Sequence, residues 1–259
     1  LGGALAAVRD MGESRRVELA PGSSWHYYAQ NDPRWGNARF EKPGSERRRT
    51  FWGSGCNPTS LAMAVANLVD MEALGALLEC SHRGRGFHIC PHTLYSRTHR
   101  CAETATIDTP EALLANFPAV MGAYAAGNNQ SGQSSRTNGG THTGYFKNIA
   151  ALFGLTLERT SSLEDLLAAL AEGSVAVAHA ARGLSPLTDT GHYVFVPYAD
   201  DAYLYIFDPL ARASYPKDTK NLIEVLSPGI LRVKICDMKG MYMPSYFKFS
   251  RQEGALAAE

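Results

Sequence analysis

Two hydrophobic periods follow one another along the chain, a helical one first and a strand-like one after it. Behind Cys56, the apolar residues Leu61, Val65, Leu68 and Val69 recur at helical spacing, which predicts a helix with one buried stripe. Further helices are predicted to open at Thr109-Pro110-Glu111, to run from Tyr145 to Phe153 before Gly154, and to follow the caps Ser161-Ser162 with Leu163, Leu166, Leu167 and Leu170 on one face.

The strand-like segments come mostly after the helical ones. Tyr193 to Val196 and Tyr203 to Phe207 flank Asp200-Asp201, so they are predicted to pair as a hairpin. The other predicted strands are Trp25 to Gln30, Val175 to Ala178, Ile230 to Ile235 and Tyr246 to Phe249. Because helices and strands are segregated rather than alternating, the predicted fold class is α+β, with an N-terminal helical part and an antiparallel sheet.

The length of 259 residues fits one large domain or two small ones, and neither an internal repeat nor a linker divides the chain. Residues 1–24 are predicted to be a loosely structured, flexible segment before a domain at 25–259. Residues 37–54 are predicted to be a polar loop. The polar run 127–144, rich in Gly, Asn, Ser and Thr, is predicted to be a flexible surface loop and a candidate lid.

Charge gives no sign of a nucleic-acid or membrane partner. Lys plus Arg equals Asp plus Glu at 25 each, and no apolar stretch reaches the about 20 residues of a membrane span. The basic run Arg47-Arg48-Arg49 is interpreted as a solvated loop. The apolar start Leu1 to Ala7 is the end of an export signal, a frayed terminus or a short helix. On the first of these interpretations we expect an extracellular or cell-surface protein, with the cytoplasm as the alternative.

Cys56 stands at the start of the first predicted helix, in Gly55-Cys56-Asn57-Pro58. Pro58 suits a first helical position, and Asn57 or Cys56 can then cap the helix. The macrodipole and unpaired N–H groups at a helix N-terminus favour the nucleophilic thiolate, and Gly55 permits close approach of the backbone. A small buried cysteine without chemical function is the alternative interpretation.

A nucleophilic thiol needs a base and a partner that orients the base. His192 opens the first strand of the predicted hairpin, and Asp208 closes the second. A three-residue loop at 199–201 sets these two side chains on one face of the sheet, whereas a two-residue loop sets them on opposite faces, and the apolar pattern does not choose. Gln30 is the candidate donor of an oxyanion hole, together with the N–H of Cys56.

Four blocks, in this order, resemble the papain-like cysteine peptidases of the bacteriocin-processing type. The blocks are Tyr28-Ala29-Gln30-Asn31-Asp32-Pro33-Arg34-Trp35-Gly36, Gly55-Cys56-Asn57-Pro58-Thr59-Ser60-Leu61-Ala62-Met63, Gly191-His192-Tyr193-Val194 and Phe207-Asp208-Pro209. The resemblance implies a papain-like fold, Cys56 as nucleophile, His192 as base, Asp208 orienting it and Gln30 in the oxyanion hole. The segment Phe146 to Leu155 resembles the middle helix of that family.

The chain departs from that family at three places. Asn57 stands where the family commonly has glycine, residues 80–101 resemble an insertion, and residues 210–259 extend past Asp208. These departures affect the expected substrate more than the expected chemistry. The interpretation that follows is thiol-dependent hydrolysis of a peptide or protein substrate, and the alternatives are a non-catalytic binding or cell-surface module and a zinc-binding module around residues 80–101.

The insertion contains three of the five cysteines, Cys80, Cys90 and Cys101, with four histidines among them. A zinc site could use four of these side chains, but the spacing lacks the usual C-x2-C pair. A Cys80–Cys101 disulfide or a plain polar insertion is the favoured interpretation, so we expect neither metal nor cofactor. With Cys236, the four cysteines other than Cys56 could form two disulfides or stay reduced.

Overall fold

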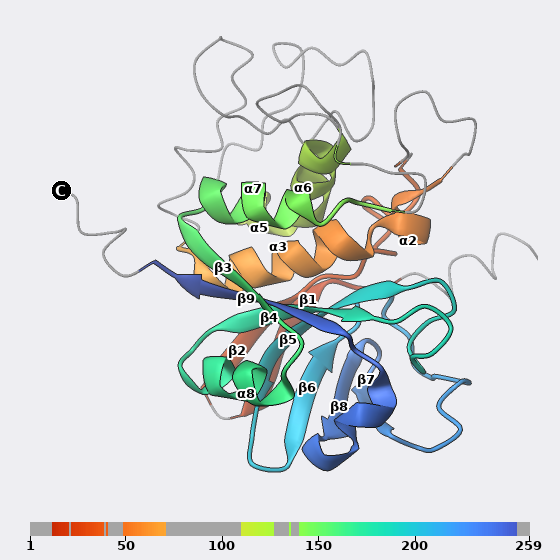
Figure 1. Cartoon of the computed structure of the whole chain (residues 1–259). Coiled ribbons are helices and arrows are strands. Elements are labelled where there is room, and N and C mark those ends of the chain that lie inside the picture. The colour runs from red at the N-terminus through yellow and green to blue at the C-terminus, as the bar shows by residue number, and fades with distance from the viewer. Residues whose placement is uncertain are drawn as a thin grey trace, which may run out of the picture.

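A seven-stranded antiparallel sheet separates a layer of helices on one face from an α-helix and a 3-10 helix on the other (Figure 1). The computed structural model describes residues 12–20, 22–38, 40, 49–70, 110–126, 135 and 140–252. None of the helices in these ranges is long and apolar enough to span a membrane. The elements are β1 (Arg15–Ala20), β2 (Ser23–Tyr27), α2 (Phe51–Ser54), α3 (Cys56–Leu68), α5 (Pro110–Ala115), α6 (Phe117–Ala126), α7 (Gly144–Leu152), β3 (Leu155–Thr160), α8 (Leu163–Ala171), β4 (Val175–Ala180), β5 (His192–Ala199), β6 (Tyr203–Phe207), β7 (Ile223–Ser227), β8 (Ile230–Lys234), the 3-10 helix η3 (Ile235–Met241) and β9 (Ser245–Arg251).

The strand order is β3-β9-β4-β5-β6-β8-β7, and β1 and β2 form a separate hairpin. All pairings among these strands are antiparallel, which confirms the predicted α+β class. The segregation is less complete than the pattern indicated, because the β1–β2 hairpin precedes every helix and β3 lies between α7 and α8. The helices α3, α6 and α7 share one hydrophobic core with one sheet face, and α8 and η3 pack on the other face.

Most predicted elements are present, and two segments predicted to lack regular structure contain a strand and a helix. The structure contains the predicted helices at α3, α7 and α8, and the predicted strands at β4, β5, β6, β8 and β9. Residues 1–24 are not uniformly loose, because Arg15–Ala20 form β1 against β2. Alternating side chains of β1 pack on the core, a pattern too short to stand out in the sequence. Within the predicted loop 37–54, Phe51–Ser54 form α2, capped by the side chain of Thr50.

Other predictions fall on segments outside the described residues. These are the start at Leu1 to Ala7, the Cys/His-rich segment 80–101 and most of the loop 127–144. For those segments the sequence predictions stand as predictions.

Helix α3 is buried on nearly all sides, rather than along one stripe. Even its polar residues Asn57, Thr59 and Ser60 are inaccessible, because α6, β2 and the sheet all contact this helix. The hydroxyl of Ser60 donates to the carbonyl of Tyr193 at 3.1 Å, which joins the first turns of α3 to the start of β5. The central helix therefore holds its N-terminus in a fixed position against the sheet.

One β-bulge interrupts the pairing of β5 with β6. Ala199 pairs with Leu204 near the turn, and Phe195 pairs with Phe207 further along, so β5 has one extra residue between the two pairs. The extra residue falls at Val196-Pro197. Proline has no N–H for the ladder, and bulges are the positions where a sheet tolerates it.

This bulge decides which side of the sheet His192 and Asp208 face. Side chains alternate along a strand, so the register at Ala199 and Leu204 alone would put His192 and Asp208 on opposite faces. The one-residue shift of the bulge brings them to the same face. Ala199 pairs with Leu204, so neither of the two loop alternatives describes the turn, and a bulge that the apolar pattern does not reveal sets the shared face.

Phe146 is the aromatic side chain that joins α7 to the sheet. Its buried ring lies 5.5, 4.6 and 6.0 Å, between centroids, from Tyr193, Phe247 and Phe249. Phe146→Ala leaves a cavity, and we expect it to lower the free energy of unfolding by about 3–5 kcal/mol. Leu226→Ala, at an exposed position of β7, is the control, with an expected cost of about 0.5 kcal/mol. Urea denaturation measures both, and equal midpoints would contradict the prediction.

Candidate active site

Cys56 is the first residue of α3 and follows the N-cap Gly55. Its side chain is partly exposed. A Cβ on Gly55 would stand 2.5 Å from the carbonyl oxygen of Phe51, so glycine is what allows α2 to turn this tightly into α3. The cap is therefore Gly55, not Asn57 or Cys56 as predicted, and Pro58 lies in the first turn, where its missing N–H breaks no helical bond.

His192 and Asp208 meet where β5 begins and β6 ends, at the end of these strands nearest to Cys56. Nε2 of His192 lies 2.6 Å from Oδ1 of Asp208, and both side chains are buried. The carboxylate accepts further hydrogen bonds from the N–H of Leu210 at 2.9 Å, Nε of Arg212 at 3.2 Å and the hydroxyl of Tyr215 at 2.7 Å. Asp208 is thus held in one orientation by donors on both of its oxygens.

These contacts fix the charges of both groups. Burial alone would raise the pKa of Asp208, but the charge and hydrogen bond of His192, with Arg212 and Tyr215, hold it well below its usual range. Burial would likewise lower the pKa of His192, but the Asp208 carboxylate and the Cys56 sulfur raise it to about 9. The imidazole is therefore protonated at neutral pH.

The Cys56 sulfur lies beside His192 and the backbone N–H groups of Tyr193 and Asn57, and all three act to lower the pKa of the thiol. Since Nε2 of His192 is engaged with Asp208, Nδ1 is the ring nitrogen that remains for the sulfur. Burial raises the pKa of the Cys56 thiol, but the bond and charge of His192 and the two backbone donors outweigh it, so the pKa is lowered overall. The geometry supports a thiolate–imidazolium pair.

Gln30 contacts both the segment that contains Asp208 and the helix α2, which precedes Cys56. Its backbone N–H donates to the carbonyl of Pro209 at 2.6 Å, and its side-chain Nε2 donates to the carbonyl of Trp52 in α2. The side chain is buried, and its Oε1 has no hydrogen-bond partner. The carbonyl of Trp52 can only accept, which assigns the amide nitrogen to that side and leaves its second N–H for another acceptor.

A model of the Peptidase_C39 like family matches residues 24–225, more than half of the chain. The chain belongs to the Peptidase_C39 like family. The resemblance inferred from the motifs is confirmed at this level, and membership supports a peptidase role. None of the curated proteins matches the chain significantly.

Three residues around Asp208 were missed by the sequence reasoning. Arg212 and Tyr215 follow Asp208 in the segment assigned above to a C-terminal extension, and the hydroxyl of Tyr27 donates to the Asp208 carbonyl oxygen at 2.8 Å. Their nearness to Asp208 along the chain could have suggested Arg212 and Tyr215. Nothing local pointed to Tyr27, which approaches from the other end of this Peptidase_C39 like chain.

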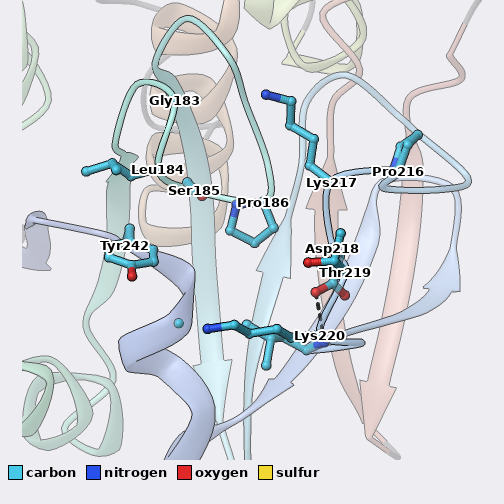
Figure 2. Close-up of a pocket in the computed structure, with 12 residues that line it drawn as sticks. Gly183, Leu184, Ser185, Pro186, Pro216, Lys217, Asp218, Thr219, Lys220 and Tyr242 are labelled. Carbon is cyan, nitrogen blue, oxygen red and sulfur yellow. Dashed lines mark hydrogen bonds between the residues drawn. The ribbon is translucent and has the colours of Figure 1, made fainter.

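A surface pocket of about 430 Å³ lies between the two chain segments that adjoin His192 and Asp208 (Figure 2). One wall is 183–186, in the connection from β4 to His192, and the other is 216–220, which follows Tyr215. An ion pair between Lys217 and Asp189 links the two connections. None of the four predicted site residues lines this pocket, so it is separate from the thiol.

Cys236 is free and exposed, so the alternative with two disulfides is wrong. Within the described ranges, no three His, Cys, Asp or Glu side chains are grouped as a metal site requires. The zinc and disulfide alternatives for residues 80–101 lie outside those ranges and stay predictions.

Gly229 holds the backbone beside Asp208. Its φ is +80°, and a Cβ there would stand 2.1 Å from the hydroxyl of Tyr27 and 2.8 Å from the carbonyl oxygen of Asp208. Gly229→Ala should therefore displace Asp208, lower the rate of Cys56 alkylation at least about tenfold and destabilise the fold by more than the about 1 kcal/mol of a left-handed alanine. The control Gly173→Ala, with φ +86° and open space around it, should show only that smaller cost. Thermal unfolding and Cys56 alkylation rates measure the two effects, and equal behaviour of both variants would argue against the close contact.

Proposed function

We propose that the protein is a thiol-dependent peptidase, with Cys56 as nucleophile, His192 as general acid and base, and Asp208 as the residue that orients His192. The observation that carries the proposal is the line of contacts from the sulfur of Cys56 through the His192 ring to the buried carboxylate of Asp208. A cysteine with only a structural role does not require a protonated histidine beside it. Nor does it require a carboxylate, with hydrogen bonds to both oxygens, that holds this histidine in place. Peptides of the bacteriocin-processing type are the substrate class that the motifs suggest.

The chemistry follows from the charges of the pair. The Cys56 thiolate attacks the carbonyl carbon of the peptide bond, and the π electrons move to the carbonyl oxygen. The imidazolium of His192 gives its proton to the amine as the C–N bond breaks, leaving a thioester. Water then loses a proton to His192 and attacks the thioester, which releases the acid and restores the thiolate. Asp208 keeps its negative charge throughout and holds the imidazole in place.

The oxyanion would form next to the first turn of α3. The N–H of Cys56 belongs to the unpaired donors of a helix N-terminus, and Gln30 supplies an amide N–H from the neighbouring segment. Both groups are fixed by backbone contacts, so no rearrangement is needed as charge develops. This is the role proposed for Gln30.

Alkylation of the folded protein by a low dose of iodoacetamide at pH 6 tests the proposal. The exposed thiol of Cys236, which has no imidazolium beside it, is the internal comparison. We expect modification at Cys56 at least about tenfold faster than at Cys236, read by peptide mapping. His192→Ala should abolish this preference, and Cys56→Ala should abolish peptide turnover while the protein stays folded.

Equal labelling of the two thiols, or full turnover by Cys56→Ala, would refute the assignment. In that case a non-catalytic binding module on the same fold becomes the better interpretation. Circular dichroism of each variant separates a lost function from a lost fold.

The pH dependence of turnover follows from the same contacts. Activity requires a thiolate, so it should already be present below the ordinary thiol pKa of about 8.5. It also requires a protonated His192, so it should fall as the pH passes about 9. Asp208→Asn removes the negative charge that raises the pKa of His192, so the falling limb should move to lower pH and kcat/KM should drop about 100-fold or more. A pH profile of kcat/KM for both proteins measures this, and an unmoved limb would contradict the role of Asp208.

A further inference from the structure

The apolar face of the sheet under α3 and α7 ends in a row of polar side chains. Ser245 of β9 pairs with His179 of β4, and His179 pairs with Tyr193 of β5, so the three residues share one face. The rings of His179 and Tyr193 lie 5.0 Å apart between centroids. This row lies at the end of the sheet where β5 begins, directly after His192.

Arg159 brings a positive charge to the row. It projects from β3 on the same face, its guanidinium carbon lies 5.5 Å from the centre of the Phe247 ring, and one of its nitrogens donates to the Ser245 hydroxyl at 3.3 Å. The neighbouring Glu158 pairs with Lys248, whereas no carboxylate of the described residues pairs with Arg159. The guanidinium is exposed and keeps most of its N–H groups available.

Tyr193, at one end of this row of polar side chains, lies next to the Cys56 thiol. The backbone N–H of Tyr193 bonds to the Cys56 sulfur, and the charges of both Cys56 and Arg159 act on the Tyr193 hydroxyl. Arg159 reaches β9, two strand spacings from β5, which is about 10 Å. An extended peptide covers about 3.3–3.6 Å per residue, so this distance corresponds to two or three residues along a bound substrate.

We propose that Arg159, with Ser245, His179 and Tyr193, forms a subsite for an anionic side chain, Asp or Glu, two or three residues from the bond that is cleaved. The proposal rests on the proposed peptidase function and names the class of its substrate. A guanidinium binds a carboxylate through two parallel N–H bonds, and its packing on Phe247 fixes the plane in which those bonds form. The Tyr193 hydroxyl and the His179 imidazole, both on partly exposed residues, supply further polar contacts along the row, while Ser245 holds the guanidinium.

Peptidyl chloromethyl ketones that alkylate Cys56 test this subsite. Acetylated tripeptide reagents carry Glu or Gln at the second or the third residue from the reactive group, with Ala elsewhere. The readout is the second-order rate constant of Cys56 modification, followed by intact mass. With the wild-type protein, we expect the Glu reagent to react about tenfold faster than the Gln reagent at one of the two positions.

Three substitutions define the source of the preference. Arg159→Gln should bring the Glu-to-Gln ratio close to one, Arg159→Lys should keep part of it, and Arg159→Glu should reverse it, so that the Gln reagent reacts faster than the Glu reagent. Lys234→Gln removes the same charge at an exposed position on β8, opposite Tyr203 and away from Asp208, and should leave the ratio unchanged. Arg159 is exposed, so its replacement should not unfold the protein.

The outcomes separate the two proposals. A wild-type ratio near one at both positions, or a ratio that survives in Arg159→Gln, overturns the anionic subsite while the reactive thiol stands. No reaction of Cys56 with any reagent, including the all-Ala tripeptide, overturns the peptidase function and the subsite with it.

Discussion

The Asp208 carboxylate is buried away from water, and its burial determines how the other groups of the site are arranged. A buried charge is costly unless donors surround it, and here four donors come from a histidine, an arginine, a tyrosine and a backbone N–H. Because both oxygens of the Asp208 carboxylate already accept hydrogen bonds, the carboxylate keeps these partners. The His192 ring is consequently held in one orientation and kept protonated, and the Cys56 sulfur receives a positive neighbour that stabilises its thiolate.

Several remote segments must arrive together for this arrangement to form. The α2–α3 turn brings the thiol, β2 ends near Gln30 and anchors Tyr27, and the ends of β5 and β6 bring the histidine and the carboxylate. Antiparallel pairing places the start of β5 and the end of β6 at one edge of the sheet (Figure 1). Because α3 is buried on nearly all sides, its N-terminus meets that edge at a fixed distance.

The same sheet provides both the proposed catalytic pair and the proposed surface for a substrate. One face of β5 carries Tyr193, whose N–H faces the sulfur and whose ring begins the polar row that ends at Arg159. The strand order places residues from Arg159 to Ser245 on adjacent strands, which are about 5 Å apart. Chemistry and selectivity would therefore rest on one rigid element rather than on separate loops.

The sequence by itself determined the local elements and the identity of the chemical groups. Helical spacing behind Cys56, capping at Ser162 and the hairpin around Asp200 are local signals, and they located α3, α8 and the β5–β6 pair. The motif blocks also supplied the four candidate site residues, because the type and the order of residues can be read from the sequence directly. Local signals are sufficient wherever the stabilising contacts lie within a few residues.

Only the tertiary structure decided which side chains meet. The bulge at Val196-Pro197 sets the faces of His192 and Asp208, and pairing rules alone did not reveal a one-residue shift. Tyr27, Arg159 and His179 gained their places through contacts with residues far away in sequence, and no periodicity marks such partners. The physical reason is that burial and electrostatic interactions depend on distances between side chains in space. Those distances are set only when the strands have paired.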